Sequence, residues 1–332
     1  MNKPQECWVV TDGRAGIENQ ALGLAEAIGR DAELIITKKT IDVTAPWKLL
    51  PRILWGDPFS RLSRSRSLLR PPFPDLWIGC GRLSVPFSMA VKSRSPDTFV
   101  VQLQNPHSPL RKFDLVVPPI HDQISGENVF PILGAPNRIT NARLKEDAVA
   151  LAPIMEQLPR PRIAVLVGGS NRANQVGQKQ AEAFCSILTD LAMGEVGLMI
   201  TVSRRTPAFI VERLERLSAR ENVFYWDGDH YGGLANPYMG ILGLADGFIV
   251  TGDSVNMACE AGTTGKPVHI YHWSGSGSRG ASAKFKLFHD ALSQRQVTRP
   301  LDNVLDEWTY APLNETNLAA DEVLRRWKAE KP

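Results

Sequence analysis

Ten short apolar runs, separated by segments of helical length, constrain the fold of this chain more than any other feature. Runs that are short, continuous and rich in valine and isoleucine are typical of strands buried on both faces of a parallel sheet. Helix-length segments such as 18–29, 84–94, 175–193 and 207–219 lie between many of them. This alternation predicts the α/β class, with doubly wound sheets. The expected strands are residues 7–10, 33–37, 75–80, 98–103, 113–119, 162–170, 197–203, 222–226, 247–252 and 267–273.

The length of 332 residues is sufficient for two ordinary domains. A segment with three prolines, residues 151–162, separates two groups of five strands and predicts a linker near 153–162. We therefore expect two Rossmann-like domains, 1–155 and 160–310, with a cleft between them. The last helical stretch, 316–332, is expected to pack back on the first domain.

Three strand ends in the second half carry groups that suit an anion. Gly168 and Gly169 end one strand, and their bare backbone allows a phosphate to approach the amides of the following helix. Asp253 and Ser254 begin another helix, where the positive end of the helix dipole favours negative charge. A serine and two arginines, 203–205, follow a third strand. The turn at Gly168 and Gly169 matches neither a Walker loop nor the dinucleotide fingerprint.

Glu260 lies one turn into the helix that begins near Ser254. It shares a helix face with Asn256 at the i, i+4 spacing. A carboxylate in this position is able to accept hydrogen bonds from two hydroxyls of a sugar ring. The alternative, a solvated charge on a helix surface, stays open.

The order of these motifs resembles the donor-sugar half of GT-B glycosyltransferases. Over residues 160–275 the chain is similar to the bacterial N-acetylglucosaminyl transferase that makes the lipid-linked peptidoglycan precursor. The match is most specific where an acid, Glu260, precedes Gly265 of the sequence Gly-Lys-Pro-Val by five residues. The resemblance implies that Glu260 holds the nucleotide ribose, that Ser254 holds the diphosphate, and that the base lies near Trp226. The donor residues expected on these grounds are Gly168, Gly169, Ser170, Asn171, Arg172, Ser203, Arg204, Trp226, Asp253, Ser254, Asn256, Met257 and Glu260.

A second resemblance spans nearly the whole chain. The sequences VTDGRAGIENQALGLAEAIG, VQLQNPHSPLRKFDLVVPPIHD, VGGSNR and TGDSVNMACEAGTTGKPVHIY together resemble the bacterial branch of the mitochondrial-fission (elongated mitochondria) family. That family is grouped with GT-B folds. Its name derives from plant members and is a poor guide to chemistry in a bacterial chain.

The first domain is expected to hold the acceptor and a catalytic base. Asp12, at the end of the first strand, is one candidate base for an inverting transfer, and His121 is a second. The loop that contains Asp12 lacks the dinucleotide spacing, so it is expected to face the acceptor or the far end of the donor. The alternative is that its polar groups only tie loops together. The acceptor-side residues expected here are Gly13, Arg14, Gly16, Gln20, Arg82 and Gln104.

Residues 46–74 combine six arginine or lysine side chains with a single acid, Asp57, and interleaved apolar and aromatic residues. This combination suits an anionic membrane surface, which a lipid-linked acceptor would make useful. The alternative is an ordinary solvated segment with one buried apolar side.

These features predict a metal-independent glycosyltransferase that moves a sugar from a nucleotide-diphospho-sugar to a cell-envelope or lipid-linked acceptor, with no further cofactor. A nucleotide-sugar 2-epimerase and a non-catalytic adaptor of the same fold at a membrane are the alternatives. A net charge of +3 argues against a general nucleic-acid binder. No apolar stretch reaches the roughly 18–20 residues of a membrane span. We therefore expect a cytoplasmic protein, at most peripheral on the inner face of the cytoplasmic membrane.

Overall fold

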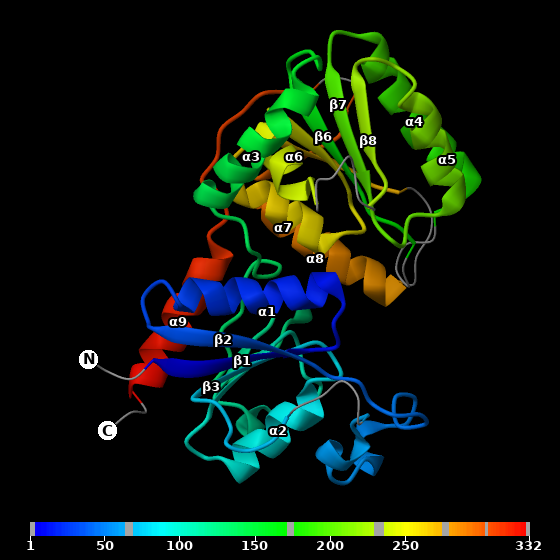
Figure 1. Ribbon diagram of the computed structural model, residues 1–332. Helices are drawn as coiled ribbons and strands as arrows, with labels where there is room; N and C mark the ends of the chain where they lie inside the picture. Colours follow the sequence, from blue (N-terminus) through cyan, green and yellow to red (C-terminus); the bar gives the residue numbers. More distant parts are fainter. Residues whose placement is uncertain are drawn as a thin grey trace. The chain divides into compact units, whose positions relative to one another are not determined.

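A computed structural model describes residues 4–63, 69–170, 176–228, 236–273, 279–302 and 305–329. The chain divides into two compact units (Figure 1). The first comprises Met1–Arg138 together with Asn314–Pro332, and the second comprises Ile139–Leu313. Each unit is built around a parallel sheet, so the predicted α/β class with two doubly wound sheets is confirmed.

The sheet of the first unit has five parallel strands in the order β2-β1-β3-β4-β5. Helices α1 (Ala15–Ile28) and α9 (Glu315–Ala329) bury their apolar side chains against one face. Helix α2 (Val85–Arg94) and the segment that follows β2 cover the other face. The strands are β1 (Gln5–Thr11), β2 (Leu34–Thr40), β3 (Leu76–Cys80), β4 (Phe99–Leu103) and β5 (Leu115–Val117). The short 3-10 turns are η1 (Arg52–Leu54), η2 (Pro58–Arg61), η3 (Leu110–Lys112) and η4 (Ile120–Asp122).

The sheet of the second unit has six parallel strands in the order β11-β10-β9-β6-β7-β8. Its strands are β6 (Arg162–Val167), β7 (Gly197–Val202), β8 (Val223–Trp226), β9 (Gly247–Thr251), β10 (Val268–Tyr271) and β11 (Thr298–Pro300). Its helices are α3 (Asn141–Met155), α4 (Gln178–Met193), α5 (Ala208–Leu217), α6 (Tyr238–Leu244), α7 (Val255–Thr263) and α8 (Arg279–Gln294). Helices α4 and α5 pack on one face of this sheet.

Helix α3 packs closely on α6 because two glycines of α6 leave room for it. A Cβ atom at Gly243 would lie 2.4 Å from the carbonyl oxygen of Leu144, and one at Gly240 would lie 2.7 Å from that of Asp147. Any larger residue at either glycine would force the two helices apart.

The division between the units falls after Arg138, earlier than the predicted linker at 153–162. That predicted linker lies inside the second unit, where its first residues end α3 and its last residue begins β6. The C-terminal helix α9 lies against α1 in the first unit, where Ala319, Val323 and Trp327 are buried (Figure 1). Among the described residues, no helix is long and apolar enough to cross a membrane.

Candidate functional site

The strand order of the second unit reverses between β6 and β9. From β6 the chain moves outward through β7 and β8, and then returns to the other side of β6 as β9. Open α/β sheets bind ligands beyond the carboxyl ends of their strands at such a reversal. The turn after β6 and the turn after β9 both lie there, so the sequence-predicted Gly168 and Asp253 are neighbours in the structure.

Short hydrogen bonds join these two turns. The Gly168 amide donates to Thr251 Oγ1 at 2.7 Å, and the Gly169 amide donates to Asp253 Oδ2 at 2.7 Å. A Cβ atom at Gly169 would lie 2.1 Å from the carbonyl oxygen of Arg205, so no side chain fits at this position. The turn is therefore fixed tightly against its neighbours.

Asp253 is 2% exposed, and both of its carboxylate oxygens are used inside the protein. While Oδ2 accepts from Gly169, Oδ1 accepts from Trp273 Nε1 at 2.9 Å. Ser254 then begins α7, and its Oγ accepts from the Met257 amide at 3.4 Å. Asp253 thus shapes the turn, and the start of α7 remains the part of this loop that suits an anion.

The end of β7 joins the same cluster through Thr206, which sequence reasoning did not single out. Thr206 Oγ1 donates to the carbonyl oxygen of Gly168 in a very short contact and lies 3.2 Å from Ser203 Oγ. The Arg205 amide donates to Ser203 Oγ at 3.3 Å. Ser203 therefore closes a local turn, while the side chains of Arg204 and Arg205 are exposed beside the glycine turn.

Glu260 does not behave as a solvated helix charge, because it pairs with a tyrosine of another helix. Tyr238 Oη donates to Glu260 Oε2 at 2.6 Å. Burial raises the pKa of Glu260 to about 7, although the hydrogen bond from Tyr238 opposes this rise. Glu260 thus changes its charge near neutral pH, and Tyr238 orients its carboxylate. No local sequence signal marks Tyr238, which lies 22 residues from Glu260.

Lys266 of the Gly-Lys-Pro-Val sequence holds the other end of the helix that carries Tyr238. Its Nζ donates to the carbonyl oxygens of Leu242 and Gly243, at 3.1 and 2.8 Å, in the last turn of α6. Cations at a helix C-terminus stabilise unpaired carbonyls and the negative end of the dipole. Helix α6 is thereby fixed at its first and last turns.

We expect Glu260→Gln to stabilise the protein at about pH 8 but not at about pH 4.5. The folded state raises the pKa of this carboxyl group from 4.5 to about 7, so it holds the proton more tightly than the unfolded chain. Stability is therefore lost as pH rises through that window, by about 3 kcal/mol once Glu260 is ionised. Gln cannot ionise and avoids this cost.

Thermal melts at both pH values measure the difference. Glu195→Gln, on an exposed residue, should change stability equally at both, and equal melting shifts for both variants would contradict the prediction.

Three other sets of predicted donor residues have different outcomes. Trp226 is the last residue of β8, and its side chain is 8% exposed, so little of its ring is available for stacking on a base. Asn171 and Arg172 lie outside the described residues. Asn256 and Met257 lie in the first turn of α7, partly exposed, on the same helix as Glu260.

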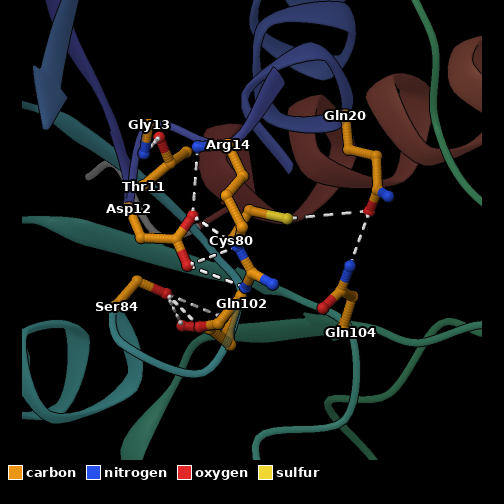
Figure 2. A network of polar contacts seen from close by, with 10 residues as sticks. Thr11, Asp12, Gly13, Arg14, Gln20, Cys80, Ser84, Gln102 and Gln104 are labelled. Atoms are coloured by element: carbon orange, nitrogen blue, oxygen red, sulfur yellow. Dashed lines mark hydrogen bonds and ion pairs between the residues drawn. The ribbon is translucent and has the colours of Figure 1, made fainter. Parts of the chain in front are cut away.

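The first unit has its own strand reversal, between β1 and β3, and the loop after β1 lies there. Asp12 and Arg14 form an ion pair in this loop, with Arg14 Nη2 2.7 Å from Asp12 Oδ2 (Figure 2). The Arg14 amide also donates to Asp12 Oδ1 at 3.2 Å. Gly13 adopts a φ of +77°, which glycine allows without strain. The loop thus presents a carboxylate and a cation together.

Gln20 and Gln104 lie beside this loop and contact each other. Gln104 Nε2 donates to Gln20 Oε1 at 2.9 Å, and Cys80 Sγ lies 3.6 Å from the same oxygen (Figure 2). Gln20 is buried, so its amide orients Gln104. Arg82 follows β3 at the same edge and is exposed, and Gly16 lies in the first turn of α1. The structure thus brings the predicted acceptor-side residues to one edge of one sheet.

The two candidate bases follow strands that are not neighbours in the sheet. Asp12 follows β1, and His121 lies in η4 after β5, the edge strand. Three strand spacings of about 4.8 Å separate β1 from β5, which is roughly 14 Å. One acceptor hydroxyl therefore cannot contact both residues, and they are alternatives rather than a pair.

Some of the apolar side chains of residues 46–74 are buried in the first unit, and others are exposed. Trp55 and Leu69 are buried, whereas Leu49 is 87% exposed and Leu54 is 58% exposed. The Arg61 guanidinium stacks on Trp47 at 3.7 Å from the ring centroid. Arg64 and Arg66 lie outside the described residues. The membrane contact expected of this segment stays a prediction.

Comparisons with known proteins agree with this architecture. The structure of the UDP-GlcNAc 2-epimerase from Methanocaldococcus jannaschii aligns with a TM-score of 0.59 over 98% of this chain and 99% of its own. The sequence identity is 9%, so this similarity is one of fold alone. The mitochondrial fission protein ELM1 of Arabidopsis thaliana is 29% identical over 308 residues, covering 84% of this chain and 70% of the plant protein. The uncharacterized protein RP120 of Rickettsia prowazekii is 26% identical over 357 residues, covering 95% of this chain and 96% of that protein. A family model described as mitochondrial fission ELM1 matches residues 15–327. The chain therefore belongs to the mitochondrial fission ELM1 family.

Proposed function

We propose that this protein is a nucleotide-sugar enzyme, and that it transfers a sugar from a nucleotide-diphospho-sugar to a cell-envelope or lipid-linked acceptor. One observation carries the proposal. The glycine turn after β6 meets the start of α7 at the strand reversal of the second unit, and Glu260 lies within α7. Backbone amides and a helix N-terminus suit a diphosphate, and a carboxylate further along the helix suits a ribose.

Under this proposal the second unit binds the donor without a metal. The amides at the start of α7 and the exposed Arg204 neutralise the diphosphate as it leaves. Glu260, oriented by Tyr238 at 2.6 Å, accepts hydrogen bonds from the ribose hydroxyls. The resemblance to GT-B enzymes supports a diphosphate contact for Ser254, and Asn171 and Arg172 are proposed to belong to the same donor site.

The first unit supplies the acceptor side. In an inverting transfer, a base removes the proton of the acceptor hydroxyl while its oxygen attacks the anomeric carbon and the bond to the diphosphate breaks. Asp12 is the proposed base because it lies at the strand reversal of this unit, and His121 is the alternative. Residues 46–74 are proposed to contact an anionic membrane surface.

A nucleotide-sugar 2-epimerase is the second candidate. The fold similarity to UDP-GlcNAc 2-epimerase over 98% of this chain favours it. An epimerase would interconvert two nucleotide sugars in the absence of any acceptor. Chromatography of the products from a nucleotide sugar incubated alone separates the two activities.

Titration calorimetry with UDP-, GDP-, ADP- and CMP-sugars tests the shared part of the proposal. We expect the sugar nucleotides of one of these four bases to bind with a Kd between about 1 µM and 1 mM. Glu260→Ala should weaken this binding about tenfold or more, which is the loss of about 1.4 kcal/mol. Glu195→Ala, an exposed residue of the same unit, should leave it unchanged. No binding of any sugar nucleotide would contradict the proposal and favour a non-catalytic adaptor.

A further inference from the structure

The first unit contains a pocket of about 640 Å³, and none of the candidate bases or predicted acceptor-side residues is among its lining residues. It lies between α2, the η1–η2 segment and the loop that follows β4, and all of its lining residues belong to this unit. Its volume falls in the range of about 300–1,000 Å³ that is typical of small-molecule sites.

One wall of the pocket is apolar. Pro86, Met89 and Ala90 lie on a single face of α2, because residues three and four positions apart point the same way. Trp55 lines the pocket from the η1–η2 segment, and its ring packs edge-on against Phe87 of α2. Apolar side chains on two facing elements make a slot that suits a hydrocarbon chain.

The ionisable groups of the pocket are all basic. Arg52, His107 and Lys112 line it, and no aspartate or glutamate is among its lining residues in the described part of the chain. Arg52 Nη1 donates to the carbonyl oxygen of Pro106 at 3.2 Å, which fixes the guanidinium. The pKa of Arg52 is lowered by burial and by the nearby charge of Arg82, so two cations lie close together here. An anion would relieve their repulsion.

The loop that carries His107 is held in an unusual conformation. Gln104 and His107 adopt φ angles of +67° and +47°, and the His107 amide donates to Asn105 Oδ1 at 2.9 Å. Residues other than glycine rarely adopt positive φ angles, so the surrounding contacts must hold the loop in this conformation beside the pocket.

We propose that this pocket binds an amphiphile with a phosphate head, whose hydrocarbon chain lies along α2 and whose phosphate contacts Arg52 and Lys112. An uncharged or cationic head fits the basic lining poorly, and a free phosphate leaves the apolar wall uncovered. The site lies within the first unit and involves no nucleotide, so its test is independent of the sugar-nucleotide titrations. Failure of one proposal leaves the other standing.

Calorimetric titration of the full chain with decyl phosphate, below its micelle concentration, tests the site. We expect saturable binding of decyl phosphate and none of decyltrimethylammonium or inorganic phosphate. Ala90→Trp, which fills the apolar slot, and Lys112→Glu, which reverses a lining charge, should each weaken binding about tenfold. Arg111→Glu makes the same charge change on an exposed neighbour outside the lining and should leave the Kd within about twofold.

Equal binding of decyltrimethylammonium would overturn the proposal, because the contact would then be apolar adhesion without a charge preference. Saturable binding of inorganic phosphate as tight as that of decyl phosphate would also overturn it. So would equal losses for Lys112→Glu and Arg111→Glu. If Ala90→Trp lacks the wild-type circular dichroism spectrum, the two exposed charge reversals still decide the outcome.

Discussion

Replacing Asp253 by asparagine is expected to destabilise the second unit by about 2–4 kcal/mol, because a buried acceptor becomes a donor. Its two oxygens accept from the Gly169 amide and from Trp273 Nε1, both at less than 3 Å. An asparagine keeps one oxygen, and its NH2 group must then face one of these two donors. The glycine turn loses its anchor, so nucleotide binding under the proposed function should fall with stability.

Thermal melts and amide hydrogen exchange measure this effect. At about 2–4 °C per kcal/mol for a unit of this size, the transition of the second unit should fall by roughly 10 °C. Exchange should accelerate in β6 and β9. Asp290→Asn is the matched control, because Asp290 forms an exposed pair with Lys286 on α8, and such pairs contribute about 0.3–0.5 kcal/mol. Melting within a degree or two of wild type for Asp253→Asn would refute the role of the carboxylate.

Trp327→Ala is expected to destabilise the first unit by about 3–5 kcal/mol. The side chain of Trp327 is 3% exposed and belongs to the core beneath α1 and the strands β1, β3 and β4. Removing the ring leaves a cavity that the packed neighbours fill only in part. The loss should accelerate exchange in β1 and β3, while β6 and β9 keep their protection.

Leu318→Ala provides the control on the same helix, because Leu318 is 44% exposed. Its expected cost is below about 0.5 kcal/mol, as for most surface substitutions. The Asp253 and Trp327 variants also control for each other, since each should loosen a different sheet. If Trp327→Ala accelerates exchange in both sheets equally, the assignment of α9 to the first unit is wrong.

Continuous apolar runs made the sheets predictable. Strands β1 to β10 each overlap a predicted run. All of them except the edge strand β2, which has no buried residue, are largely buried on both faces and so have no polar alternation to obscure them. Strand β11 was missed because its three residues, Thr298–Pro300, are short, largely polar and lie at a sheet edge. Such strands have no pattern of their own, and their neighbours determine them.

The predicted linker failed at a proline inside a helix. Helix α3 begins at a Thr140 cap, whose Oγ1 accepts from the Arg143 amide at 3.3 Å. Its buried residues Leu144, Leu151 and Met155 follow helical spacing. Pro153 lies in the last turn and is exposed, where water can replace the missing hydrogen bond. The sequence-based prediction gave more weight to the three prolines in residues 151–162 than to the helical pattern, which the cap and the spacing support.

Residues that adjoin a strand end could be placed from the sequence, whereas partners from other elements could not. Gly168 and Asp253 were predicted to lie at one edge, and they share a hydrogen-bonded turn through Gly169. Tyr238 and Thr206 were missed because their roles arise only from tertiary contacts. The burial that raises the pKa of Glu260 to about 7 likewise has no signature in the local sequence.

The return of α9 to the first unit affects the order of folding during synthesis. Domains usually fold as the ribosome releases them, beginning at the N-terminus. Here the core of the first unit is completed by residues 315–329, which are translated only after the whole of the second unit. The second unit, Ile139–Leu313, emerges whole before that point. The nascent N-terminal half thus waits with an uncovered apolar face on α1, and this face is where we expect chaperones to bind the growing chain.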